Sequence, residues 1–104
     1  MADSSKFCSK LSVIFTGRVQ GVGFRMTVVE IAKDFEVTGE IYNVSNGTVE
    51  MKAFGDEEEL FRFLRAIQMR FKRNIINLWQ DLENNVSADQ PMSGGFCIRS
   101  DKID

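Results

Sequence analysis

The spacing of apolar and polar residues separates helical stretches from extended ones along this chain. Two stretches repeat apolar residues at intervals of four, three and four, the spacing that places side chains on one face of a helix. They are Phe24, Val28, Ile31 and Phe35, and then Leu60, Leu64, Ile67 and Phe71. The sequence therefore predicts two amphipathic helices, one starting at Phe24 and the other at the acidic run Asp56–Glu59, where carboxylates suit the first turn.

Extended structure is predicted where β-branched and aromatic residues gather between turn residues. These stretches are Leu11–Phe15, Gly39–Tyr42, Thr48–Phe54, Ile75–Leu82 and Phe96–Ile98. Asn46-Gly47 predicts a hairpin between the second and third of them, because both residues tolerate a positive φ. The polar stretch Glu83–Gly95 is predicted to be a loop, and residues 1–7 a flexible tail.

The order of these elements is strand, helix, strand, strand, helix, strand, followed by a short last strand. Two helices on one face of a mostly antiparallel sheet give a ferredoxin-like α/β sandwich (βαββαβ) of the α+β class. A length of 104 residues suits a single domain, expected to span 1–104. Because this architecture carries many unrelated activities, function has to be argued from particular residues.

Composition narrows the function classes. Hydrophobic residues make up 43% and charged residues 27%, and the net charge is -2, so a nucleic-acid partner is not expected. No apolar run is long enough to span a membrane, and no signal peptide is recognisable. Cys8 and Cys97 predict free thiols of a cytoplasmic protein, although the sequence alone leaves a disulfide between them open. With no histidine and no ligand-type spacing, neither a metal nor a cofactor is expected.

The segment Gly17–Arg25 is the first candidate for chemistry. It has three glycines in its first seven residues and leads directly into the first predicted helix. Such a loop can direct several backbone N–H groups at one anion, and the helix N-terminus adds a partial positive charge. Arg25 could add a planar guanidinium that binds two phosphoryl oxygens. The alternative is a tight strand-to-helix turn with a solvated arginine, and the residues by themselves favour neither.

Two motifs in the chain resemble those of the acylphosphatase family. Gly17-Arg18-Val19-Gln20-Gly21-Val22-Gly23-Phe24-Arg25 is similar to the family's first motif, and Gly39–Glu50 is similar to its second. The resemblance implies a ferredoxin-like fold and hydrolysis of acyl phosphates to a carboxylate and inorganic phosphate. Inorganic phosphate is also expected to inhibit, because the loop N–H groups, the helix N-terminus and the Arg25 guanidinium would bind it. The resemblance assigns the catalytic positions to Arg25 and Asn43. Phosphate binding is assigned to Arg25 together with backbone N–H groups of Gln20, Gly21, Val22, Gly23 and Phe24.

This chemistry is consistent with a chain that has no histidine. The leaving group of an acyl phosphate is a carboxylate with a pKa of roughly 4, so it leaves without being protonated. The loose transition state of phosphoryl transfer requires an oriented water more than a deprotonated one. A neutral carboxamide at Asn43 could orient that water, and the activity is expected to need no metal.

Some positions depart from the family pattern, and two other functions stay open. Glu40 stands where the family often has an aromatic residue, no Gly-Pro turn follows the second helix, and Asn46-Gly47 replaces a common Asp-Gly. One alternative is a non-catalytic anion-binding or regulatory module of the same family. The other is a ferredoxin-like RNA-binding module, which would need paired strand aromatics that Phe15 and Phe54 do not provide.

Overall fold

The structure is a computed structural model that describes residues 7–87 and 95–103. It contains the predicted elements in the predicted order. They are β1 (Phe7–Gly17), α1 (Phe24–Ala32), β2 (Val37–Asn43), β3 (Val49–Gly55), α2 (Glu57–Arg70), β4 (Ile75–Ser87) and β5 (Phe96–Ile98).

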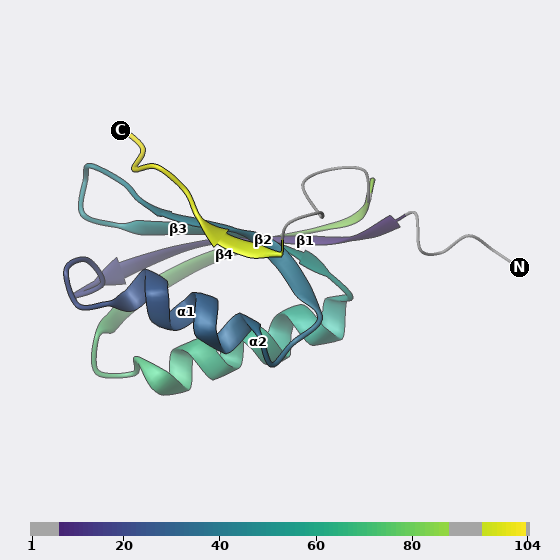
Figure 1. The fold of residues 1–104 in the computed structure, drawn as a ribbon, viewed down its shortest axis with the longest axis horizontal. Helices are drawn as coiled ribbons and strands as arrows, with labels where there is room; N and C mark the ends of the chain where they lie inside the picture. Colours follow the sequence, from purple (N-terminus) through teal and green to yellow (C-terminus); the bar gives the residue numbers. More distant parts are fainter. Residues whose placement is uncertain (1–6, 88–94, 104) are drawn as a thin grey trace, which may run out of the picture.

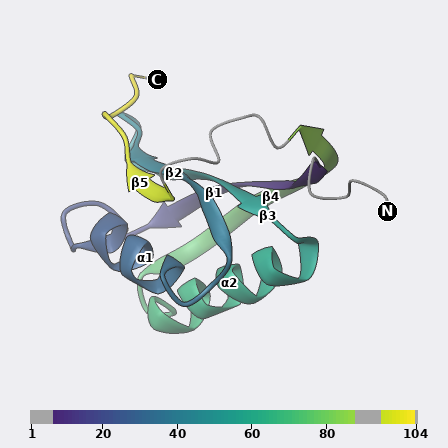
Figure 2. The same cartoon turned by 45° about the vertical axis from the view of Figure 1, so that its right-hand side comes forward.

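The strands form one sheet in the order β4-β1-β3-β2-β5. All neighbours are antiparallel except β2 and β5, which run parallel. Both helices cover the same face of the sheet and leave the other face without a helix (Figures 1 and 2). The predicted ferredoxin-like α+β sandwich, mostly antiparallel with two helices on one face, is therefore confirmed.

The core lies between this sheet and the two helices. Alternate residues of the central strands are buried on the helix side, and the predicted apolar stripe of α2 packs against them. The ring of Phe24, the first residue of α1, lies 5.0 Å from the ring of Phe15 and 4.6 Å from that of Phe71, measured between centroids. These contacts attach the start of α1 to β1 and to the end of α2. They fix the position of the residue that follows, Arg25.

The first strand is longer than predicted. It begins at Phe7 rather than Leu11, so Phe7 does not belong to a flexible tail and Cys8 lies within a strand. Ser9 pairs with Gly55 of β3, and Phe7 pairs with Ser87 of β4. A strand with a partner on each side has its backbone N–H and C=O groups hydrogen-bonded whatever its side chains are. This pairing outweighs the weak strand preference of the local sequence. Residues 1–6 of the predicted tail lie outside the described residues.

The prediction of a loop from Glu83 is wrong for its first five residues, because β4 continues to Ser87. Here the pairing with β1 is irregular between Cys8 and Lys10, and Asn85 takes a φ of 59°. The Ser9 hydroxyl donates to Oδ1 of Asn84 at 2.7 Å. A β-bulge of this kind lets a polar stretch stay paired at a sheet edge. The rest of the predicted loop, 88–94, lies outside the described residues.

The hairpin between β2 and β3 forms where Asn46-Gly47 predicted it. Of these two residues only Gly47 has a positive φ, 98°. The Asn46 side chain instead stabilises the turn, since its Oδ1 accepts hydrogen bonds from the backbone N–H of Thr48 at 3.0 Å and from its hydroxyl at 2.7 Å. This is the local side-chain-to-backbone bonding typical of asparagine in turns.

Candidate active site

The loop between β1 and α1 has the backbone geometry of an anion-binding site. Gly21 and Gly23 have φ values of 74° and 76°, in the left-handed region that other residues rarely adopt. Gly23 is the N-cap of α1 and offers no side chain to the helix end. Within residues 7–87 and 95–103, the structure records no hydrogen bond from the backbone N–H groups of 19–23. The loop therefore leaves donors unused at the positive end of a helix.

Gln20 joins this loop to the β2–β3 hairpin. Its side-chain amide donates to the carbonyl oxygen of Val44 and to that of Thr48, both at 2.8 Å. The sequence assigned Gln20 only a backbone N–H, so this bridging role of its side chain was missed. It had no local signal, because the acceptors lie 24 and 28 residues further along the chain. The bridge holds the two motifs at a fixed separation.

Asn43 is the last residue of β2, next to the hairpin that Gln20 contacts. Its backbone carbonyl accepts a hydrogen bond from the N–H of Lys102 at 2.8 Å. Its side-chain Oδ1 is buried and has no hydrogen-bond partner among the described residues. Leaving a buried carbonyl-type acceptor unpaired costs roughly 1–3 kcal/mol. A bound water or ligand that donates a hydrogen bond to this atom would remove that cost.

Arg25 is the second residue of α1, and its side chain is 33% exposed. Its Nη1 lies 3.4 Å from Oδ1 of Asp101, a carboxylate that is 65% exposed. The pair is long and partly solvated, and a contact of this kind contributes little to stability. Several guanidinium N–H donors remain available for another ligand. Sequence reasoning did not identify Asp101, which stands 76 residues from Arg25.

The segment after β5 brings Asp101 to the site. Its backbone follows β2 and the hairpin: the N–H of Arg99 donates to the Ile41 carbonyl at 2.9 Å, and the N–H of Ser45 donates to the Lys102 carbonyl at 2.9 Å. Val44 and Lys102 form a further parallel bridge. The segment thus contacts Arg25 through the Asp101 side chain and contacts Asn43 through the Lys102 backbone, so one short stretch of chain touches both predicted catalytic residues.

Side chains on the outer face of the sheet hold this segment in place. The Arg99 guanidinium pairs with Glu40 at 2.6 Å and lies over the Tyr42 ring, 4.6 Å from its centroid. The Tyr42 hydroxyl donates to Glu50 at 2.9 Å, and Lys102 lies 3.7 Å from the same carboxylate. Burial, and then the bond to Glu50, raises the pKa of Tyr42 to about 12. Glu40, a departure from the family pattern, therefore serves to anchor the C-terminal segment.

Other kinds of site find less support. In the described part of the chain, no group of three or more cysteines, aspartates and glutamates is placed to hold a metal ion. Cys8 and Cys97 are both free, so no disulfide joins them, and burial raises the pKa of the Cys8 thiol. Over the same residues, no helix is long and apolar enough to cross a membrane.

The fold is that of a ferredoxin-like domain with a glycine-rich loop at the start of its first helix. Comparison with known proteins makes this specific, since the acylphosphatase family model matches residues 11–96. The chain belongs to the acylphosphatase family.

Curated relatives agree over part of their length. The acylphosphatase of Methanospirillum hungatei is 47% identical over 58 residues, which cover 56% of this chain and 64% of that protein. The acylphosphatase of Bacillus licheniformis is 52% identical over 56 residues, which cover 54% of this chain and 62% of that protein. The chain thus matches less than two thirds of the length of each relative.

Solved structures match more of the fold at lower identity. The acylphosphatase from Bacillus subtilis superposes with a TM-score of 0.69 and 26% identity, covering 88% of this chain and 98% of that one. An acylphosphatase from Coxiella burnetii gives a TM-score of 0.68 at 25% identity, covering 95% and 100%. A full-length HypF in its phosphate- and nucleotide-bound form gives 0.68 at 28% identity, covering 95% of this chain but 12% of that one.

Proposed function

We propose that this protein hydrolyses acyl phosphates to a carboxylate and inorganic phosphate. The single observation that carries the proposal is the buried, unpartnered Oδ1 of Asn43 beside a loop of unused backbone donors. An oxygen of this kind can accept a hydrogen bond from a water molecule and orient it. Membership of the acylphosphatase family supports the same reaction.

In the proposed mechanism the phosphoryl group is held by the N–H groups of Gln20, Gly21, Val22, Gly23 and Phe24. The Arg25 guanidinium binds two of its oxygens and stabilises their charge in the transition state. The existing contact with Asp101 leaves other N–H donors free for this purpose. In this role the positive field comes from the loop, the helix N-terminus and one guanidinium, without a metal ion.

The water held by Asn43 attacks phosphorus, and the bond between phosphorus and the acyl oxygen breaks. The carboxylate leaves with the bonding electron pair, and the proton of the water passes to the phosphate or to solvent. No general acid is required, because the leaving group has a pKa of roughly 4. Gln20 contributes by fixing the loop against the hairpin, so that water and phosphorus stay aligned.

We also propose a cytoplasmic location, which the two free thiols support. Inorganic phosphate, the product, should act as a competitive inhibitor because it would occupy the same loop. We expect neither nucleic acid nor a membrane surface as a partner.

The test is steady-state hydrolysis of benzoyl phosphate by the purified chain, with and without inorganic phosphate and EDTA. We expect turnover, competitive inhibition by phosphate and no loss of activity in EDTA. Loss in EDTA that magnesium or zinc restores would contradict the proposed mechanism.

The second candidate is a non-catalytic anion-binding or regulatory module. The match to 12% of a much longer HypF chain favours it, since the same fold there forms part of a larger protein. Phosphate binding detected by calorimetry, without any hydrolysis, would support the module and contradict the enzyme.

A further inference from the structure

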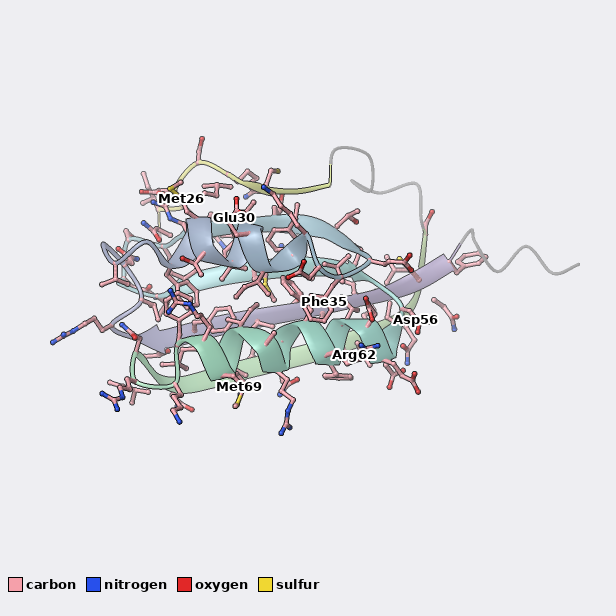
Figure 3. All side chains as sticks on the ribbon, turned by 60° about the horizontal axis from the view of Figure 1, so that its bottom comes forward. Met26, Glu30, Phe35, Asp56, Arg62 and Met69 are labelled. Atoms are coloured by element: carbon pink, nitrogen blue, oxygen red, sulfur yellow. The ribbon has the colours of Figure 1, made fainter. Side chains whose placement is uncertain are left out.

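A groove lies between α1 and β5, next to the proposed phosphate site. Its volume is about 300 Å³, and it is lined by Met26, Val29, Glu30, Phe96, Cys97 and Ile98. Figure 3 shows the labelled Met26 and Glu30 on the side of α1 that carries the yellow C-terminal segment. None of the proposed steps of phosphate binding or water attack uses this groove.

Two residues that line the groove lie close to Arg25 along α1. Val29 follows Arg25 by four residues, one turn further along the same face of α1, and Met26 is the next residue in the chain. On the opposite wall, the segment that carries Ile98 continues to Asp101, which contacts the Arg25 guanidinium. An acyl phosphate held by Arg25 through its phosphoryl group could therefore place its acyl group between these two walls.

The lining has the character of a site for an apolar group. Met26 and Ile98 are 69% and 41% exposed, so these large apolar side chains contribute little to the core. Among the described residues, the one charged residue of the lining is an acid, Glu30, which pairs with Lys33 at 2.9 Å, so the lining they form offers no cation to an acyl group that ends in a carboxylate. A second cavity of about 320 Å³ shares Val29 and Phe96 with the first.

We propose that this groove binds the acyl group of the substrate and gives the enzyme a preference for acyl phosphates with an uncharged, apolar chain. The proposal rests on the proposed function, because it requires an acyl phosphate bound at Arg25. Exposed apolar residues that line a concave surface beside a reacting group are the usual means of recognising an apolar substituent.

The test is a homologous series of acetyl, propionyl, butyryl and hexanoyl phosphate, which share one reacting group and differ in chain length. Each methylene that leaves water can raise kcat/KM by up to about fourfold. We expect kcat/KM to rise along the series, through a lower KM, until the groove is filled.

Met26→Ser and Ile98→Thr should flatten this rise without changing inhibition by inorganic phosphate, which does not enter the groove. Both positions are exposed, so both variants should fold. Met69→Ser is the matched control, because Met69 is 61% exposed on α2 (Figure 3) and should leave the series unchanged.

If the unmodified protein hydrolyses acetyl phosphate but its kcat/KM does not change with acyl chain length, this inference is wrong and the proposed function stands. Equal flattening by Met69→Ser and Met26→Ser would also overturn it. Failure to hydrolyse any member of the series would overturn the proposed function, and this inference with it.

Discussion

The N-termini of the two helices differ in their electrostatics. α2 has Asp56 as its N-cap and Glu57, Glu58 and Glu59 in its first turn. α1 has a glycine N-cap, no acidic residue in its first turn, and Arg25 as its second residue. Both ends carry the partial positive charge of unpaired N–H groups. In α2 the chain's own carboxylates offset this charge, whereas in α1 the chain adds a further positive charge.

The N-terminus of α2 is stabilised by the chain itself, whereas the N-terminus of α1 is available to a ligand. Three carboxylates at α2 favour the helix without an external partner. At α1 the loop donors and the buried Asn43 oxygen have no partner in the described residues, and the nearby acid, Asp101, makes a long and partly solvated contact. An external anion such as phosphate would accept hydrogen bonds from the loop donors, whereas the Asn43 oxygen would accept one from a water molecule.

The largest expected effect comes from Arg25→Lys, which keeps the charge at α1 but removes the planar fork. Two charge-assisted hydrogen bonds at roughly 1.5–3 kcal/mol each predict a loss of about 10²–10⁴-fold in kcat/KM, with weaker phosphate inhibition. Arg62→Lys on α2, whose side chain is 73% exposed, is the control and should retain full activity. Kinetics on samples with matched thermal melting curves provide the measurement, and a fully active Arg25→Lys would contradict the assigned role.

Asn43→Ala should affect the reaction rather than phosphate binding. Loss of an oriented water predicts a fall in kcat of about a hundredfold, while the inhibition constant for phosphate stays within about twofold. Asn46→Ala is the matched asparagine of the same hairpin. It removes the acceptor for Thr48, so it should lower the free energy of unfolding by about 1 kcal/mol and leave kcat intact. Loss of phosphate inhibition in folded Asn43→Ala would refute the assignment to water.

Val22→Glu would give the α1 end a carboxylate, as the α2 end already has. Val22 is 41% exposed and lies in the loop just before the N-cap, so its substitution should not disturb the core. Repulsion of bound phosphate predicts a rise of roughly two- to fivefold in the inhibition constant at low salt, shrinking as salt is added. Val22→Gln is the uncharged control. An equal effect from glutamine would mean that shape, not charge, is responsible.

Glu58→Gln on α2 should have the smallest effect and should change stability alone. Removing one exposed first-turn carboxylate predicts a loss of about 0.3–1 kcal/mol in the free energy of unfolding at low ionic strength. Denaturant titration at two salt concentrations measures this loss, while kcat/KM should be unchanged. A clear fall in activity would show that the two helix ends are not independent.

Local sequence patterns predicted much of the fold. The apolar stripe of α2, the glycine loop and the hairpin each depend on residues close together in the chain, and each forms where expected. β1 and β4 were predicted too short, because several of the residues near their ends are polar and have little intrinsic strand preference. Pairing across the sheet decides such positions, because an unpaired backbone group costs more free energy than a residue of low strand preference does.

By itself the sequence determined the order of the elements and the position of the glycine-rich loop, and it supplied the two candidate residues Arg25 and Asn43. Only the tertiary structure decided that the C-terminal segment runs beside β2 and brings Asp101 to Arg25. It also decided that the Gln20 side chain joins the two motifs. The physical reason is one of range: turn chemistry and periodicity act over a few residues, whereas these contacts join residues more than twenty positions apart.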